Sequence, residues 1–333
     1  MLQWWCLDKK RIHVVLLDNG RNRSKALCES NLPSLPCMAH TLQLVVNEGL
    51  LSQRSITDVV ATARKIVGHF KHSTLAYSRL HDIQAQLGQP SKRLQQDVST
   101  RWDSTYFMPQ SLVEQRRALG AYAAEHDLSA TLNAHQWGLI ENVMSLLTPF
   151  EELTKEITFC TATAADVIPA ITALKRLLEK GADTDRGKTT LLEAVQRRFS
   201  KIERQPLYTL ATVIDPRYKN HYFSAEVKDQ VKQVLLAMLE GQTRHALDEP
   251  VAGASAVHGL VTEAPSAKKP CSLLLSVHDE ILKENAEVEQ LLASPSSVQV
   301  QSYLSELPSS RSKNALAYWR INKDHFPVLA PLA

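Results

Sequence analysis

Apolar residues recur with helical spacing over residues 56–70. They fall at every third or fourth position, which places them on one face of an α-helix: Ile56, Val59, Val60, Ala63, Ile66, Val67 and Phe70. Ser55 and Asp58 form an S-x-x-D pair, which is typical of the first turn of a helix. The pattern predicts an amphipathic helix that begins near Ser55 and buries this stripe.

Five further stripes have the same period and predict five more helices. They are Trp137, Ile140, Met144, Leu147; Val167, Ile171, Leu174, Leu178; Leu191, Val195, Phe199, Ile202; Val227, Val231, Val234, Met238; and Ile281, Val288, Leu291, Leu292. Each stripe is interpreted as helical core with no chemistry of its own. No repeat of fixed period accompanies the stripes, so a solenoid is not expected.

A different pattern precedes the helices. Residues 12–17 (IHVVLL) form a short, nearly continuous apolar run, which is typical of a buried central strand. The turn-forming residues 18–20 (DNG) follow this run. A short helix is expected over residues 22–28, and Pro33 and Pro36 interrupt the next stretch.

Residues 241–272 have no helical period and are rich in Ala, Gly, Ser, Pro and Val. This composition predicts a flexible linker or a long loop. Residues 294–297 and 308–312 are expected to be further breaks between helices.

Composition limits the class of protein without assigning a function. The 333 residues are 44% hydrophobic and 22% charged, as in folded globular proteins, and their number suits two lobes. A net charge of +3 neither requires nor excludes nucleic acid as a partner. The sequence has no secretory signal pattern, and no apolar run approaches the ~20 residues of a membrane-spanning helix. Five irregularly spaced cysteines favour reduced thiols in an intracellular protein.

Five short blocks follow one another along the chain: residues 17–22 (LDNGRN), 37–44 (CMAHTLQL), 99–105 (STRWDST), 214–219 (IDPRYK), and 316–319 (LAYW) with 326–330 (FPVLA). Taken in order, these blocks resemble the hAT superfamily of DNA transposases and the host proteins derived from them, including the BED-type zinc finger proteins. Each block is weak alone. Together, the blocks extend the resemblance over nearly the whole chain.

The resemblance implies a mostly α fold, in which a partial RNase H-like α/β core is interrupted by a large all-helical insertion. The expected domains are the core at 1–40, the insertion at 41–240, the linker at 241–272, and a segment at 273–333. This last segment would hold the end of the insertion and the start of the hAT-type C-terminal dimerisation segment. The BED finger of the family would lie upstream and is not expected in this chain.

Asp18 matches one of the three carboxylates that hold two divalent metals, Mg²⁺ or Mn²⁺, in the catalytic site of the family. On the residues alone, a cap of the turn or of the next helix is the favoured interpretation of Asp18. The family's other two carboxylates are expected before and after the matched region. Asp18 is therefore expected to be a vestigial metal-ligand position, with no cofactor bound and no DNA strand cleavage by this chain.

Cys37 and His40 have the spacing of half a zinc site. No second pair follows, and a structural zinc ion takes four ligands, so no metal site is expected. The resemblance implies a structural pair at the junction of core and insertion, which orients the segment that contains Asp18. A packed cysteine beside a hydrogen-bonded histidine is the alternative.

Arg101 and Trp102 are the candidate DNA-binding residues. In the family that this chain resembles, a tryptophan at this position stacks on DNA where a base is flipped out, and Arg101 would pair with phosphate. Nearby basic residues would add positive charge: Lys92, Arg93, Arg116 and Arg117. The alternative is a tryptophan buried between helices and an arginine in a surface ion pair.

Two blocks are given structural or assembly roles. Residues 215–219 are expected to form a turn fixed by Pro216, in which Asp215 caps the next helix, with no chemistry. In the last block, Trp319, Phe326 and Leu329 are the candidate dimerisation residues, and if exposed they would form an apolar patch.

Three functions follow from the resemblance. The favoured one is a domesticated or decayed transposase that binds DNA and dimerises in the nucleus without catalysis. The alternatives are an active hAT transposase in an incomplete gene model and a helical protein-interaction scaffold that does not bind DNA. DNA and a second copy of the chain are the expected partners, and no membrane association is expected.

Overall fold

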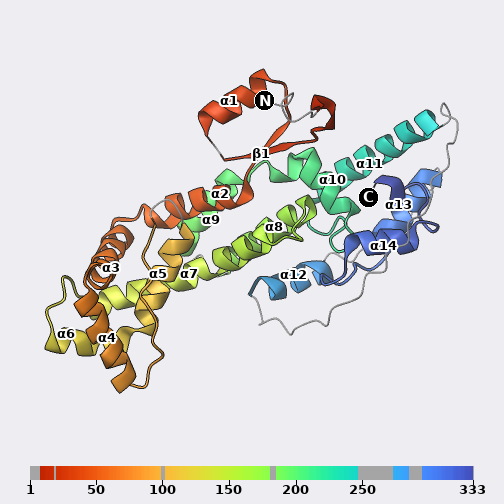
Figure 1. Cartoon of the computed structure of the whole chain (residues 1–333). Helices are drawn as coiled ribbons and strands as arrows, with labels where there is room; N and C mark the ends of the chain where they lie inside the picture. The colour runs from red at the N-terminus through yellow and green to blue at the C-terminus, as the bar shows by residue number, and fades with distance from the viewer. Residues whose placement is uncertain are drawn as a thin grey trace. The chain divides into compact units, whose positions relative to one another are not determined.

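The computed structural model describes residues 8–18, 20–98, 102–180, 185–246, 273–284 and 295–332. Within these residues the chain is mostly α-helical, and its β-structure is one pair of short parallel strands (Figure 1). The predicted mostly α fold class is confirmed.

The chain forms two compact units. Unit 1 comprises Met1–Cys160 and Leu178–Ser200, and unit 2 comprises Thr161–Leu177 and Lys201–Ala333. The domain boundaries predicted at residues 40 and 240 each fall inside a unit, and the domains of the resemblance remain a prediction.

Unit 1 contains the two strands and most of the helices of the first half of the chain. Its elements are η2 Lys9–Arg11, β1 Val15–Leu17, α1 Arg21–Glu29, β2 Ser34–Pro36, α2 Met38–Val46, the π-helix η3 Asn47–Leu51, α3 Arg54–His72, α4 Thr74–Gln86, α5 Trp102–Glu114, α6 Arg116–Glu125, α7 Ala134–Thr158 and α9 Arg186–Arg198. Helix α3 packs against α4, α5 and α7, and α4 also packs against α6.

Unit 2 contains most of the remaining helices. Its elements are η4 Ala164–Asp166, α8 Val167–Glu179, whose last two residues belong to unit 1, η5 Ile202–Arg204, α10 Pro206–Ile214, α11 Ala225–Ala246, α12 Leu273–Glu284, α13 Pro295–Ser305, α14 Ala315–Asn322 and η6 Ala330–Leu332. Helix α11 therefore covers the first residues of the predicted linker, and residues 247–272 lie outside the described part of the chain.

The predicted N-terminal strand is present but shorter and less buried than expected. Strand β1 pairs in parallel with β2, in a register that places Leu16 opposite Leu35, and α1 forms the crossover between the strands. The prediction of a buried central strand is wrong, because the side of β1 away from β2 faces no described strand. Leu16 is consequently 65% exposed, whereas Leu35 is buried.

Helix α3 confirms the stripe predicted over residues 56–70. All seven apolar residues of that stripe are buried. The helix begins at Arg54, close to the predicted start, and Gln53 is the N-cap residue, with no side-chain cap. Ser55 lies within the first turn and does not cap it.

One stripe differs from the prediction in register. In α11, Val231 is buried as expected, but Val234 and Met238 are 46% and 40% exposed, whereas Leu235 and Leu239 are fully buried. The run VLLAML is apolar on adjacent positions, so periodicity alone does not decide which row faces the core. Of the other stripes, Trp137 and Met144 are half-buried, Ile202 lies in η5 after the end of α9, and Val288, Leu291 and Leu292 lie outside the described residues.

Residues 215–219 form the centre of unit 2. Asp215 is the C-cap residue of α10 and does not cap the next helix, because α11 begins only at Ala225. Its carboxylate accepts hydrogen bonds from the backbone N–H and the guanidinium of Arg217. The same guanidinium pairs with Asp166, and Tyr218 donates to the Asp166 carboxylate at 2.6 Å. This buried network supports the structural role expected for the block.

The candidate dimerisation residues lie in the core of unit 2. Trp319 is 5% exposed and donates from Nε1 to the carbonyl oxygen of Ile214, and its ring lies 5.0 Å from that of Tyr303. Phe326 and Leu329 are each 1% exposed. In the described part of the chain, these three side chains therefore form no exposed apolar patch.

Candidate functional site

The candidate DNA-binding pair lies at the start of α5. Trp102 is the first residue of this helix, and Arg101 lies outside the described residues. The chain approaches α5 through residues 89–98, an irregular segment that has neither helix nor strand.

Hydrogen bonds from three helices hold this approach segment. Gln84 of α4 donates to the carbonyl oxygen of Lys92 at 3.0 Å, and the backbone N–H of Gln95 donates to Ser111 Oγ of α5 at 3.0 Å. Lys71 of α3 donates to the side-chain oxygen of Gln96. The segment is therefore positioned by α3, α4 and α5, although it has no secondary structure of its own.

Asp97 is the most completely buried charge of the approach segment. Its side chain has no exposed surface, and its carboxylate accepts hydrogen bonds from Arg64 of α3 at 2.5 Å and from Thr105 Oγ1 of α5 at 2.8 Å. Ser104 Oγ lies 3.0 Å from the same carboxylate and accepts a hydrogen bond from the backbone N–H of Val98 at 2.7 Å. A buried carboxylate needs such partners, because an unpaired charge in the interior is costly.

Three of the four basic residues expected near Trp102 have partners within unit 1. Lys92 pairs with Glu114 at 2.9 Å, and Arg116 pairs with Glu141 at 2.9 Å. Arg93 lies over the ring of Tyr77, and Arg116 over that of Trp137, each within 5 Å of the ring centroid. The two ion pairs are exposed, so each contributes little to stability.

Asp18 follows β1 directly and forms an ion pair with Arg23 of α1 at 2.9 Å. It does not cap α1, whose N-cap residue is Gly20, with no side-chain hydrogen bond. Its Oδ1 atom is buried and has no hydrogen-bond partner among the described residues, and a hollow of about 300 Å³ opens beside it. The lining residues are Asp18, Gly20, Arg21, Asn22 and Arg23.

This hollow does not fit a two-metal site. Its lining has one carboxylate and two guanidinium groups, whereas two divalent cations require several anionic oxygen ligands. In the described part of the chain, no group of three His, Cys, Asp or Glu side chains is arranged to hold a metal ion.

A backbone hydrogen bond joins Cys37 to Leu17, the residue before Asp18. Cys37 is the N-cap residue of α2, and its N–H donates to the carbonyl oxygen of Leu17 at 2.7 Å. Its own carbonyl oxygen accepts from the hydroxyl of Thr41 at 2.9 Å. His40 is half-buried in the first turn of the same helix. The block 37–44 thus connects the end of β1 to the first helix of the predicted insertion.

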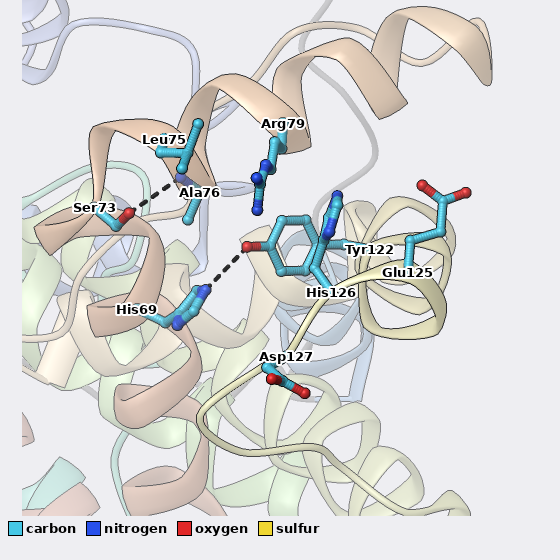
Figure 2. Close-up of a pocket in the computed structure, with 9 residues that line it drawn as sticks. All are labelled: His69, Ser73, Leu75, Ala76, Arg79, Tyr122, Glu125, His126 and Asp127. Carbon is cyan, nitrogen blue, oxygen red and sulfur yellow. Dashed lines mark hydrogen bonds between the residues drawn. The ribbon is translucent and has the colours of Figure 1, made fainter.

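The structure also forms a polar hollow that the sequence did not indicate (Figure 2). It has a volume of about 400 Å³ and lies where the end of α3 meets α4 and α6. His69 Nε2 lies 3.1 Å from the hydroxyl of Tyr122, and Arg79 points toward the same tyrosine. Glu125 and Asp127 also line it, so both charge signs are present. Its residues come from three helices and share no short motif, which explains why sequence patterns do not reveal it.

Asp97 is the functional candidate that sequence reasoning missed. The only signal in the sequence was an acidic residue just before the block 99–105. The role of this residue depends on its contact with Arg64 of α3, which no local pattern indicates.

None of the helices in the described part of the chain has the length and apolar character needed to cross a membrane.

Comparison with known proteins places these blocks in a family. Residues 35–146 match the model of the ZBED1 RNase-like helical domain. Zinc finger BED domain-containing protein 4 of Homo sapiens is 30% identical over 99% of this chain and 28% of its own length. Zinc finger BED domain-containing protein 6 of Homo sapiens is 31% identical over 62% of this chain and 22% of its own length.

A Zea mays protein named "Putative AC transposase" is 22% identical over 97% of this chain and 40% of its own length. The chain thus spans less than a third of the length of the two human relatives. The resemblance stated from the five sequence blocks is confirmed. The chain is thus a homologue of the BED zinc finger proteins and the hAT-type transposases over nearly its whole length.

Proposed function

We propose that the chain binds DNA through the segment that leads into α5, with Trp102 stacking on an unpaired base and Arg101 pairing with phosphate. The observation that supports this proposal most is the fixed entry to α5, where the buried carboxylate of Asp97 joins α3 to the first turn of α5. Binding of an unstacked base is favoured by an aromatic residue on a rigid element, and Trp102 is the first residue of this anchored helix.

The test is a DNA titration at several salt concentrations, with a duplex that has a short single-stranded overhang. Binding through phosphates makes the logarithm of affinity fall linearly with the logarithm of salt concentration. Trp102→Ala is expected to weaken binding by about five- to 150-fold, because base stacking on an aromatic ring contributes ~1–3 kcal/mol.

Trp137→Ala is the matched control, since Trp137 lies on α7 and stacks on Arg116 within unit 1. Equal losses of affinity in the two variants would contradict the proposal. No measurable binding by the unaltered chain at low salt would favour the scaffold function instead.

We also propose that this chain does not cleave DNA. Asp18 has Arg23 as its ionic partner, and the hollow beside it has two cationic side chains, which disfavours divalent metals. The test is incubation of transposon-end DNA with the chain and Mg²⁺ or Mn²⁺. Metal-dependent nicking that Asp18→Asn abolishes would overturn this part of the proposal and favour an active transposase.

Dimerisation through the C-terminal segment and residence in the nucleus complete the proposal. Because Trp319, Phe326 and Leu329 are buried within unit 2, the outward residues of α14 are better placed for a second copy. Leu316 and Ile321 are 64% and 78% exposed. Imaging of the tagged full-length protein tests the location, and exclusion from the nucleus would contradict it.

A further inference from the structure

We propose that Asp97 is a positioning residue for the start of α5, where the proposed DNA-binding residue Trp102 lies. The inference rests on the proposed function and assigns a role to a residue outside the family block at 99–105. Asp97, Arg64, Ser104 and Thr105 are called the Asp97 clasp below. The clasp joins α3, the approach segment and the first turn of α5.

The geometry of the clasp fixes both sides of the candidate site. On one side, Ser104 Oγ accepts a hydrogen bond from the N–H of Val98 and lies 2.9 Å from its carbonyl oxygen. On the other side, Thr105 donates to Asp97 from the first turn of the helix that begins at Trp102. The clasp therefore holds both Val98, at the end of the approach segment, and the helical turn in which Trp102 lies.

The carboxylate of Asp97 is paired with a cation within this arrangement. Arg64 contributes both Nε and a terminal nitrogen to the same carboxylate oxygen, each at 2.5 Å, while its own side chain is 43% exposed. A carboxylate near a helix N-terminus is also favoured by the helix dipole. Because Arg64 balances its charge, the buried Asp97 places no unpaired negative charge beside the phosphates of the proposed DNA partner.

The sign of the effect separates positioning from simple electrostatics. Removal of a negative charge near bound DNA strengthens binding, because the protein then repels the phosphates less. Loss of a positioning residue weakens binding, because the stacking residue loses its fixed place. Asp97→Asn keeps the size of the side chain and removes the charge, so the direction of the change in affinity is informative.

The experiment is a double-mutant cycle on the full chain with the same overhang DNA. Asp97→Asn is expected to weaken binding by about tenfold, within the range of a lost base-stacking contact. In the Trp102→Ala background it is expected to cause no further loss, because residues that act through one another are not additive. Ser104→Ala is a milder second variant, which leaves the Arg64–Asp97 pair intact and is expected to show the same non-additivity.

The matched control is Thr190→Val on α9. The Thr190 hydroxyl lies 2.6 Å from the carbonyl oxygen of Gly49, so the variant removes another side-chain hydrogen bond inside unit 1, away from α5. It is expected to bind DNA as the unaltered chain does. A DNA-free readout is the rate of trypsin cleavage after Arg101, which is expected to rise in Asp97→Asn and not in Thr190→Val.

The outcomes distinguish this inference from the proposed function. If the unaltered chain does not bind DNA, the proposed function fails, and the role of the clasp in binding fails with it. If the unaltered chain binds, the inference alone is overturned by tighter binding of Asp97→Asn or by a loss of affinity no larger than that of Thr190→Val. Additive losses with Trp102→Ala would overturn it as well.

Discussion

Lys219 is a buried side chain that joins residues 215–219 to the end of α13. It has no exposed surface, and its Nζ donates to the carbonyl oxygens of Tyr303 at 2.6 Å and Glu306 at 2.8 Å. Both acceptors lie at the end of α13, where helix carbonyls have no partner within the helix. Burial lowers the pKa of Lys219 to about 8, an effect that nearby Glu306 partly opposes.

Lys219→Met is expected to destabilise the chain by about 2–5 kcal/mol, because two buried carbonyl groups each lose their donor. The measurement is the free energy of unfolding from denaturant titration. Lys232→Met is the control, since Lys232 makes a single hydrogen bond to the side chain of Gln301 between α11 and α13. Its expected cost is within about 1 kcal/mol. Equal costs would contradict the role assigned to Lys219.

His278 predicts a dependence of stability on pH. It is fully buried in α12, with Nδ1 2.9 Å from the hydroxyl of Tyr222. Burial lowers its pKa to about 3, and the positive charge of Arg311 acts in the same direction. His278 is therefore neutral in the folded chain at neutral pH, whereas the unfolded chain binds a proton below about pH 6.5.

A depressed folded-state pKa means that the contribution to stability is present above pH 6.5 and is lost as the pH falls toward 3. Between pH 7 and pH 5 this group is expected to cost about 2 kcal/mol of stability. His278→Gln keeps a polar side chain that does not titrate, so its stability is expected to fall less over the same interval. Parallel pH profiles of the two proteins, measured by denaturant unfolding, would refute this assignment.

At the scale of elements, the π-helix η3 is packed more closely than any sequence pattern indicates. A Cβ atom on Gly49 would lie 2.9 Å from both the Cα of Leu191 and the carbonyl oxygen of Thr190 in α9. These are backbone atoms, which cannot move aside without shifting the helix. The close approach of η3 to α9 therefore requires glycine at this position.

Gly49→Ala is expected to destabilise the chain by about 1–3 kcal/mol, because it overpacks a contact between two backbones. Gly120→Ala provides the matched control on α6, where an added Cβ would meet no atom within 4 Å. That change is expected to be neutral or to stabilise by up to about 1 kcal/mol, since alanine favours the helix. Thermal unfolding measures both, and a similar shift of the two midpoints would count against the close contact.

At the scale of the whole molecule, the prediction concerns self-association. Removal of the segment after residue 312 would open the core of unit 2, because Trp319 and Phe326 are buried there. The informative change is the double variant Leu316→Glu with Ile321→Glu, which alters only exposed positions of α14.

We expect light scattering to report a dimer for the unaltered chain and a monomer for this double variant, with unchanged thermal unfolding. A charged residue at an apolar interface lacks a partner and opposes association. Leu75→Glu is the control, since Leu75 is 59% exposed on α4 in unit 1. Equal masses for the unaltered chain and the double variant would contradict an interface on α14.

Local patterns in the sequence determined the helical fold class, the seven-residue core stripe of α3, the short strand before Asp18 and the family. These features depend on residues close together along the chain, and their period or order is visible without a structure. Only tertiary structure decided which apolar row of α11 is buried, because adjacent rows are equally apolar and the neighbouring helices select between them.

The partners of the candidate site residues also depended on the tertiary structure. That Asp97 is clasped by Arg64, that Trp319 is a core residue and that His69 meets Tyr122 all depend on contacts between segments far apart in the chain. Burial and ion pairing are properties of the packed chain, since a charge or an aromatic ring has the same sequence letter whether it is exposed or enclosed. The residue types were determined by the sequence, and their partners were decided by the packing of the helices.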